Sequence, residues 1–146
     1  MDSVKHIQML QTAYAGALAE AVLQYGKENV LSAVVSRKRQ ENLTSGRMRA
    51  AQLGITRPEE VFSRLAEIFG CANWDITGKP DNFTAQAKGC RLCAIARNIG
   101  AQQPCHLYCL NPMEGMVKAI SDNTEFIVDE TLWESSRCSI RVIANR

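Results

Sequence analysis

Four of the six cysteines in the chain lie between Cys90 and Cys109, and they are the residues best suited to chemistry. Cys90 and Cys93 form a C-x2-C pair, and Cys105 and Cys109 form a C-x3-C pair. A C-x2-C pair lets two thiolates approach one ion, and a second pair can complete a tetrahedral zinc site. Iron–sulfur clusters also take four thiolates. The pattern therefore predicts a zinc or iron centre. Its expected ligands are Cys90, Cys93, Cys105 and Cys109, with His106 and Cys138 as further candidates.

Two other interpretations of these cysteines stay open. A redox dithiol needs only Cys90 and Cys93, and a helix starting near Cys90 would lower the pKa of that thiol. Thioredoxin-like proteins, however, place such a pair in a βαβ unit, which the helical first half does not provide. A free cysteine can also fill a core as a small hydrophobe. We expect that role for Cys71 and Cys138, because both lie in strand patterns.

The composition predicts one globular domain over residues 1–146, with a helical part at 1–70 and a sheet part with the cysteine cluster at 71–146. The chain is 46% apolar and 22% charged, and its net charge is only +2. We therefore expect neither nucleic acid nor a membrane surface as partner. Glu20 interrupts the one stretch that is similar to a signal peptide, and no window reaches the ~20 apolar residues of a membrane span. The expected location is the cytoplasm.

Helical periodicity predicts three helices in the first 70 residues. The first has apolar residues at spacings of three and four, namely Ile7, Leu10, Tyr14, Ala17, Leu18, Ala21 and Tyr25. The second begins near Val30, with a break expected at Gly46. The third opens with a capping box between Thr56 and Glu59 and ends at Gly70.

Alternating patterns after residue 70 predict two β-hairpins separated by short helices. "CANWDIT" and "NFTAQAK" flank the turn "GKPD", and "TEFIVDETLW" and "CSIRVIAN" flank "ESSR". Short helices are expected over Leu92–Asn98 and over "NPMEGMVKAI", the latter with Asn111 as its cap and Pro112 at its first position. The predicted fold class is α+β, with N-terminal helices packed on one face of a four-stranded antiparallel sheet.

Two charged segments outside the cysteine cluster are further candidate sites. The basic residues between 37 and 49 favour a solvated helix face over a phosphate site, since no aromatic residues interleave with them. They are Arg37, Lys38, Arg39, Arg47 and Arg49. Glu130 shares a strand face with Phe126 and Val128, so burial there would raise its pKa and suit it to general acid or base chemistry. The default for such a carboxylate is an edge position in water.

The last hairpin, "ETLWESSRCSIRV", preceded by "C-x2-C" and a further cysteine, resembles a domain found in two families. These are the bacteriochlorophyll 4-vinyl reductase-type proteins and the L-2-amino-thiazoline-4-carboxylic acid hydrolase-like family. The motif resemblance covers residues 60–146. Haem-dependent nitric-oxide sensors and some vesicle-tethering subunits share the same fold. The resemblance implies a small-molecule-binding domain, often dimeric, with Cys138 and the other cysteines converging near a pocket.

Three functions follow as expectations. The first is a small-ligand sensor or carrier with a cysteine-lined pocket or a cysteine-bound metal. The second is a hydrolase of a small cyclic C–N or C–S substrate, in which a cysteine such as Cys93 or a metal-bound water attacks and His106 or Glu130 moves the proton. The third is a structural subunit whose helices form a homodimer.

Overall fold

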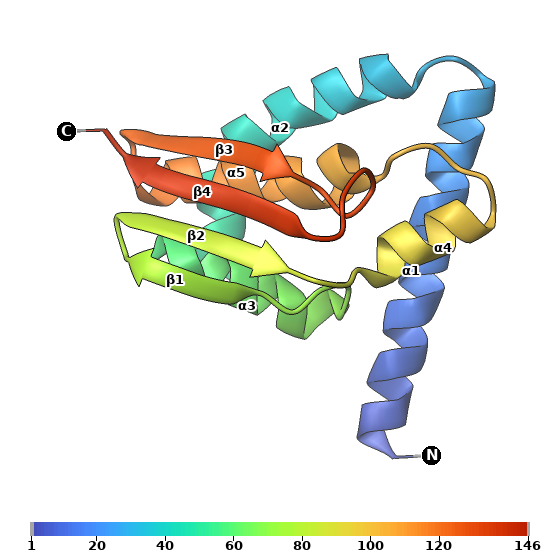
Figure 1. The fold of residues 1–146 in the computed structure, drawn as a ribbon, viewed down its shortest axis with the longest axis horizontal. Helices are drawn as coiled ribbons and strands as arrows, with labels where there is room; N and C mark the ends of the chain where they lie inside the picture. Colours follow the sequence, from blue (N-terminus) through green and yellow to red (C-terminus); the bar gives the residue numbers. More distant parts are fainter. Residues whose placement is uncertain (1, 146) are drawn as a thin grey trace.

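The computed structural model describes residues 2–145 and confirms the α+β fold class (Figure 1). Three helices come first: α1 (Ser3–Lys27), α2 (Leu31–Gln52) and α3 (Pro58–Phe69). The remaining elements are β1 (Asp75–Lys79), β2 (Asn82–Ala87), α4 (Arg91–Asn98), a π-helical segment (His106–Leu110), α5 (Asn111–Ile120), β3 (Thr124–Glu130) and β4 (Cys138–Ala144).

The two predicted hairpins join into one antiparallel sheet with the strand order β1-β2-β4-β3. Phe83, Ala85 and Ala87 share one face of β2, and this face is buried as the alternation predicted. Their partners on β4 are Val142, Ile140 and Cys138. Helices α2, α3 and α5 lie behind this face of the sheet, while α1 and α4 lie beyond one end of it (Figure 1). The cysteine-bearing start of β4 therefore faces the junction between the two helix groups.

Gly46 does not break the second helix, because α2 runs unbroken from Leu31 to Gln52. The glycine instead allows α2 to cross α5 at very close range. A Cβ added to Gly46 would lie 2.1 Å from the carbonyl oxygen of Gly115, and one added to Gly115 would lie 2.3 Å from the carbonyl oxygen of Asn42. Both distances are shorter than any normal contact, so two facing glycines set the separation of the helices.

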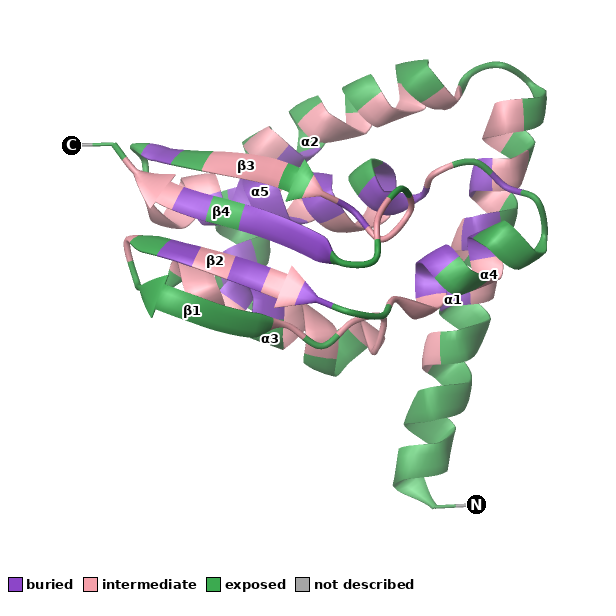
Figure 2. Ribbon diagram, in the orientation of Figure 1, coloured by how far each residue is buried: buried purple, intermediate pink, exposed green. Residues whose placement is uncertain are grey.

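The apolar stripe predicted for the first helix is only partly its buried face. Ala15, Ala19 and Val22 form the buried contact, whereas Ile7 is 51% exposed and Leu10 is 71% exposed. The first turns of α1, before Gln11, project past the rest of the domain (Figure 2). The periodicity identified the helix correctly but could not show that its first turns lack a neighbour.

Two local predictions in the middle of the chain need correction. Arg57, not Thr56, is the N-cap of α3, and Thr56 donates a hydrogen bond to Glu60 rather than pairing with Glu59. The first strand begins only at Asp75, where its ladder with β2 starts. Cys71 therefore lies in the segment between α3 and β1, and not within a strand.

The helix expected to begin at Asn111 starts earlier, in a π-helical turn that runs directly into α5. The backbone N–H of Asn111 donates to the carbonyl of His106, five residues back. Proline lacks an N–H and its ring clashes with the carbonyl four residues earlier, which for Pro112 is that of Tyr108. The wider π turn accommodates this residue, and Asn111 is therefore not a cap.

Candidate functional site

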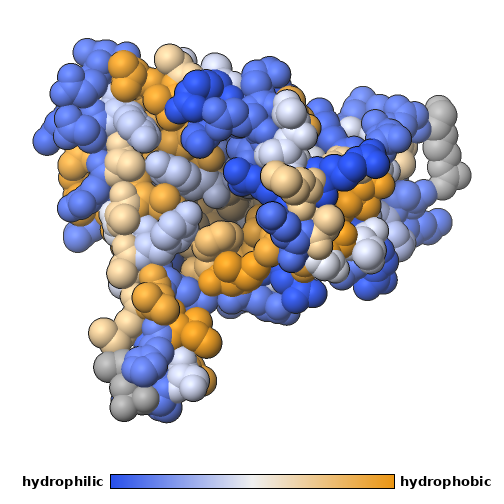
Figure 3. Space-filling model, turned by 180° about the vertical axis from the view of Figure 1, so that it is seen from behind, coloured by the Kyte–Doolittle hydropathy of each residue, from blue (hydrophilic) through white to orange (hydrophobic). Residues whose placement is uncertain are grey.

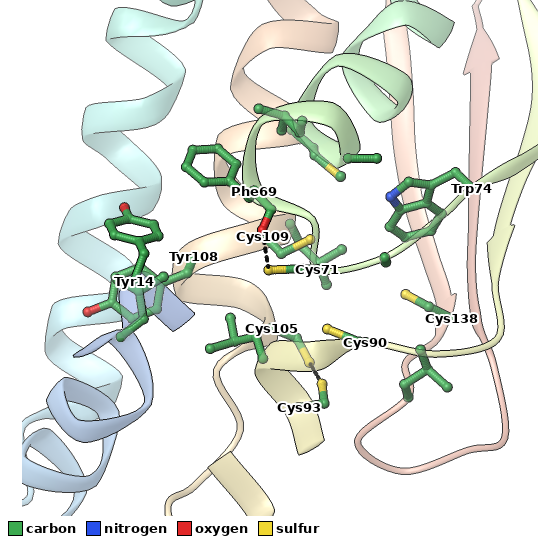
Figure 4. Close-up of a pocket in the computed structure, with 18 residues that line it drawn as sticks. Tyr14, Phe69, Cys71, Trp74, Cys90, Cys93, Cys105, Tyr108, Cys109 and Cys138 are labelled. Atoms are coloured by element: carbon green, nitrogen blue, oxygen red, sulfur yellow. Dashed lines mark hydrogen bonds between the residues drawn. The ribbon is translucent and has the colours of Figure 1, made fainter. Parts of the chain in front are cut away.

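A small apolar cavity lies where the two helix groups meet the end of the sheet, and all six cysteines line it (Figure 4). They are Cys71, Cys90, Cys93, Cys105, Cys109 and Cys138. Its volume is about 80 Å³. The other walls come from apolar and aromatic side chains such as Tyr14, Phe69 and Trp74. The sulfur atoms are thus the main polarisable groups that a ligand would meet.

Four separate elements bring these cysteines together. Cys71 follows α3, Cys90 and Cys93 begin α4, and Cys138 begins β4. Cys105 and Cys109 lie one helical turn apart at the π-helical segment, so their side chains share one face. The sequence resemblance implied that the cysteines converge, and the fold places all of them at one cavity.

Cys93 and Cys105 are in direct contact, with their sulfur atoms 3.4 Å apart. Cys93 also lies beside Cys90, and a hydrogen bond from the Cys93 thiol lowers the pKa of Cys90 to about 6. Backbone amides in the first turn of α4 reinforce this effect, although no conventional capping bond forms. Hydrogen bonding to Cys93 likewise lowers the pKa of Cys105. Hydrogen bonding with Cys105, and then with Cys90, raises the pKa of Cys93 itself.

The remaining three thiols are held neutral. Burial, reinforced by the nearby Cys90, raises the pKa of Cys71 to about 11. Burial raises the pKa of Cys138 to about 12 and that of Cys109 well above its usual range. Cys90 is therefore the cysteine that carries a thiolate most readily at neutral pH.

A shallow polar hollow on the surface adjoins the cavity and shares Cys71, Ala72 and Cys90 with it. These shared residues place Cys90 between solvent on one side and the apolar interior on the other. Lys88 and Arg91 also line the hollow, together with the acidic Asp75. Because the hollow shares residues with the cavity, we refer to it as the entrance.

The two other candidate catalytic residues lie away from this cavity. His106 is exposed and is not among the lining residues. Glu130 forms an ion pair with Arg137 at the end of β3, also outside the lining. A bulge after Val128 breaks the alternation that had placed Glu130 on the face of Phe126. Neither side chain is positioned to move a proton to or from a ligand in the cavity.

The predicted metal centre is wrong. Among residues 2–145, no group of three or more histidine, cysteine, aspartate or glutamate side chains is arranged to hold a metal ion. The sulfur atoms of Cys93 and Cys105 instead contact each other directly, at 3.4 Å. Zinc and iron–sulfur ligation by these residues is therefore corrected to thiol–thiol contact.

The basic segment on α2 is a solvated face tied by ion pairs, as its composition predicted. Arg37 and Lys38 both pair with Glu41. Arg39 reaches across to α5 and forms two hydrogen bonds with the buried Glu114, at 2.9 and 3.1 Å. This last contact fastens the two crossing helices and was not visible in the sequence.

Sequence reasoning missed the aromatic walls of the cavity. Phe69 was assigned to the buried stripe of the third helix, and Tyr14 to that of the first, without any sign that the two rings stack at 5.5 Å. Trp74 was assigned to a strand, whereas it precedes β1 and packs edge-on against Phe62. The clustering of aromatic residues around the cysteines depends on contacts between distant segments.

Comparison with known proteins identifies the fold only. No family model and no curated protein matches the sequence. A solved structure that matches is subunit 3 of a trafficking protein particle complex from Naegleria fowleri, covalently bound to palmitic acid. Its TM-score is 0.64 at 10% identity, and the match covers 95% of this chain and 97% of that one. The matching structure is a trafficking subunit and not a hydrolase-like protein, so the expected hydrolase-like character is corrected, while the resemblance to the 4-vinyl reductase-type domain stays a prediction.

Among the described residues, no helix combines the length and apolar character required to cross a membrane. The long helix α1 illustrates why. Its face toward α4 is apolar, but polar residues such as Lys5 and Glu20 recur along its length.

Proposed function

We propose that this domain binds a small apolar ligand in the cysteine-lined cavity and serves as a carrier or sensor. The convergence of all six cysteines and several aromatic rings on one apolar cavity supports this proposal. Concave, mostly apolar cavities with a few polar groups are the usual form of small-molecule sites. Neutral thiols at Cys71, Cys109 and Cys138 keep most of the wall uncharged.

The size of the cavity limits the ligand class. A cavity of roughly 150 Å³ holds a benzene molecule, so one of about 80 Å³ accepts only a few carbon atoms without movement of its walls. We infer a ligand with a short apolar segment inside and a polar end at the entrance beside Lys88 and Arg91. A fatty acid has this form when its terminal carbons enter the cavity and the rest of its chain stays at the entrance or displaces the walls. The palmitic acid named with the structural neighbour supports an acyl chain as the ligand class.

Binding of octanoate, measured by isothermal calorimetry on the full chain, tests the proposal. We expect saturable binding that Ala72→Phe abolishes, because Ala72 borders both the cavity and its entrance. Ala94→Phe is the matched control, since Ala94 is exposed on α4 and lies outside the cavity. Palmitate provides a second probe. Failure of both acids to bind, or equal binding by the Ala72→Phe variant, would refute the proposal.

We also propose that a second copy of the chain covers the projecting first turns of α1. Val4, Ile7 and Leu10 form an exposed apolar row along its first turns, and Tyr14 continues it. Figure 3 shows hydrophobic side chains gathered on this projecting segment. Two identical rows can pack against each other across a two-fold axis, which is the commonest symmetry of oligomers. The sequence resemblance also implies a dimer.

Light scattering coupled to size exclusion tests the dimer. The expected mass is twice the 16.2 kDa of one chain. Leu10→Asp should give a monomer, while Ala13→Asp, at an exposed position on the other side of the same helix, should not change the mass. A monomeric wild-type protein at micromolar concentration would contradict the proposal.

A further inference from the structure

Three cysteines lead from the surface into the interior. Cys90 lines both the surface hollow and the cavity, and Cys93 lies three residues on in the first turn of α4 and lines the same cavity. Cys93 and Cys105 are buried, and their sulfur atoms are 3.4 Å apart. The outer thiol is accessible and the inner pair is not. This order is independent of any ligand in the cavity.

We propose that Cys90, Cys93 and Cys105 form a thiol–disulfide relay that passes two electrons from the buried pair to a small anionic disulfide. Cys90 is the attacking thiol at the entrance. Cys93 is the resolving thiol, and Cys105 completes the final buried disulfide. The proposal stands whether or not the cavity binds an apolar ligand.

The first step is attack by the Cys90 thiolate on one sulfur of the external disulfide RSSR. The bond between the two R-bearing sulfurs breaks, and a new bond joins Cys90 to one of them. The other leaves as a thiolate, RS⁻, and takes up a proton from water. The product is a mixed disulfide at Cys90.

The next two steps move the disulfide inward. Cys93 loses its proton and attacks the Cys90 sulfur, so a Cys90–Cys93 disulfide forms and the second RS⁻ leaves with that proton as RSH. Cys105 then loses its proton and attacks Cys93, and the released Cys90 sulfur becomes a thiol or thiolate again. In total, RSSR is reduced to two RSH, and the Cys93–Cys105 dithiol is oxidised to a disulfide. The last step joins two sulfur atoms that are 3.4 Å apart, and the step before it joins two cysteines of the first turn of α4.

The charges at the entrance favour an anionic disulfide. Lys88 and Arg91 flank Cys90 in the surface hollow, with Asp75 as the acidic residue there. A terminal guanidinium nitrogen of Arg91 donates a hydrogen bond to Thr12 at 3.3 Å, and the guanidinium group has further N–H donors suited to a carboxylate. Glutathione disulfide carries carboxylates close to its sulfur atoms, so it is a suitable probe.

Cys71 provides an internal contrast at the same entrance. It lines the same hollow and the same cavity, and its thiol contacts the carbonyl oxygen of Phe69 at 3.8 Å. Figure 4 draws this bond to the carbonyl oxygen, and burial together with the neighbouring Cys90 raises the pKa of Cys71. The relay therefore assigns initial attack to Cys90 and leaves Cys71 reduced.

The test is oxidation of the reduced full chain by glutathione disulfide, with disulfides mapped by differential alkylation and mass spectrometry. We expect one Cys93–Cys105 disulfide and no stable glutathione adduct. Cys93→Ser should trap glutathione on Cys90, and Cys105→Ser should stop the reaction at a Cys90–Cys93 disulfide. Cys90→Ser should slow oxidation at least tenfold.

Ala94→Ser, at an exposed position of α4 outside both the hollow and the cavity, is the matched control, and it should leave the rate and the product unchanged. Circular dichroism of each variant separates loss of folding from loss of the relay. Unchanged oxidation of the Cys90→Ser variant would overturn the relay, as would a first adduct on Cys71 in the folded wild-type protein. The mapping in the wild-type chain decides the question even where a variant does not fold.

Discussion

The sulfur atom of Cys93 lies 3.4 Å from that of Cys105, although the two residues belong to different helical segments. This contact defines the centre of the site. Hydrogen bonding with Cys93 lowers the pKa of both Cys90 and Cys105, so thiolate character lies on these two partners. The spacing of four cysteines in two pairs suggested a tetrahedral metal site. Three of them, Cys90, Cys93 and Cys105, instead form a row of thiols with Cys93 in the middle.

The row predicts that Cys90 is far more reactive than Cys71. The thiolate is the reactive form of cysteine, and the pKa values are about 6 for Cys90 and about 11 for Cys71. At pH 7, iodoacetamide should therefore modify Cys90 at least about a hundredfold faster than Cys71. Time-resolved peptide mapping measures both rates. The Cys90 rate should fall below pH 6, and a midpoint near pH 8.5 would contradict the assignment.

Removing the donor should restore an ordinary thiol at Cys90. In Cys93→Ala, no neighbouring S–H stabilises the Cys90 thiolate, so its pKa should rise and its alkylation midpoint should move upward by more than one pH unit. The measurement is the same alkylation profile. Cys109→Ala also removes a cavity thiol but no donor to Cys90, and it should leave the midpoint in place. Equal midpoints in wild type and Cys93→Ala would show that Cys93 is not the cause.

The crossing of α2 and α5 predicts a steep penalty for one added methyl group. Gly46→Ala would place its Cβ 2.1 Å from the Gly115 carbonyl oxygen, so the helices must separate. We expect a loss of about 3 kcal/mol in the free energy of unfolding. Gly16→Ala on α1 meets nothing within 4 Å and should stabilise by roughly 0.5–1 kcal/mol through helix propensity. Urea denaturation measures the free energy of unfolding of both variants. Similar changes in the two would contradict the close crossing of α2 and α5.

Local patterns predicted the fold well because its elements carry strong periodicity and clear turns. The alternation of Phe83, Ala85 and Ala87 fixed the buried face of β2, and Gly70 ended α3 in the left-handed conformation, with φ at 63°. Hairpin turns then required antiparallel neighbours. The order of all four strands follows once the two hairpins join through β2 and β4.

The candidate site was harder to predict because its geometry depends on contacts between remote segments. From their spacing alone, Cys90 and Cys93 could equally bind a metal ion, form a redox dithiol or fill the hydrophobic core. The distinction comes from Cys105, which reaches Cys93 only through the packing of α4 on the π-helical turn. Gly46 shows the same limit, since its apparent role as a helix break changed once its neighbour Gly115 was known.

Glu114 should stabilise the α2–α5 contact in a pH-dependent way. Burial alone would raise its pKa, but hydrogen bonds from Arg39 and Lys118 outweigh this and lower it below 4.5. Its contribution is therefore complete above pH 4.5 and is lost as the pH falls through the lowered value. Glu114→Gln should lower the free energy of unfolding by about 1–2 kcal/mol at pH 7. The loss stays this small because Arg39 is partly exposed, and solvent weakens its ion pair with Glu114. The difference from wild type, measured by urea denaturation, should shrink near pH 3.

Oxidation of the inner pair should stabilise the domain. A Cys93–Cys105 disulfide closes a short loop, and cross-links of this kind stabilise folded proteins by about 3 kcal/mol through the unfolded chain. The sulfur atoms already touch, so closure needs little rearrangement of α4. Diamide-treated protein should therefore unfold at higher urea concentration than reduced protein, and Cys105→Ser should abolish the difference. A lower midpoint after oxidation would mean that the disulfide strains the cavity walls, and the buried pair would then be a poor end point for the relay.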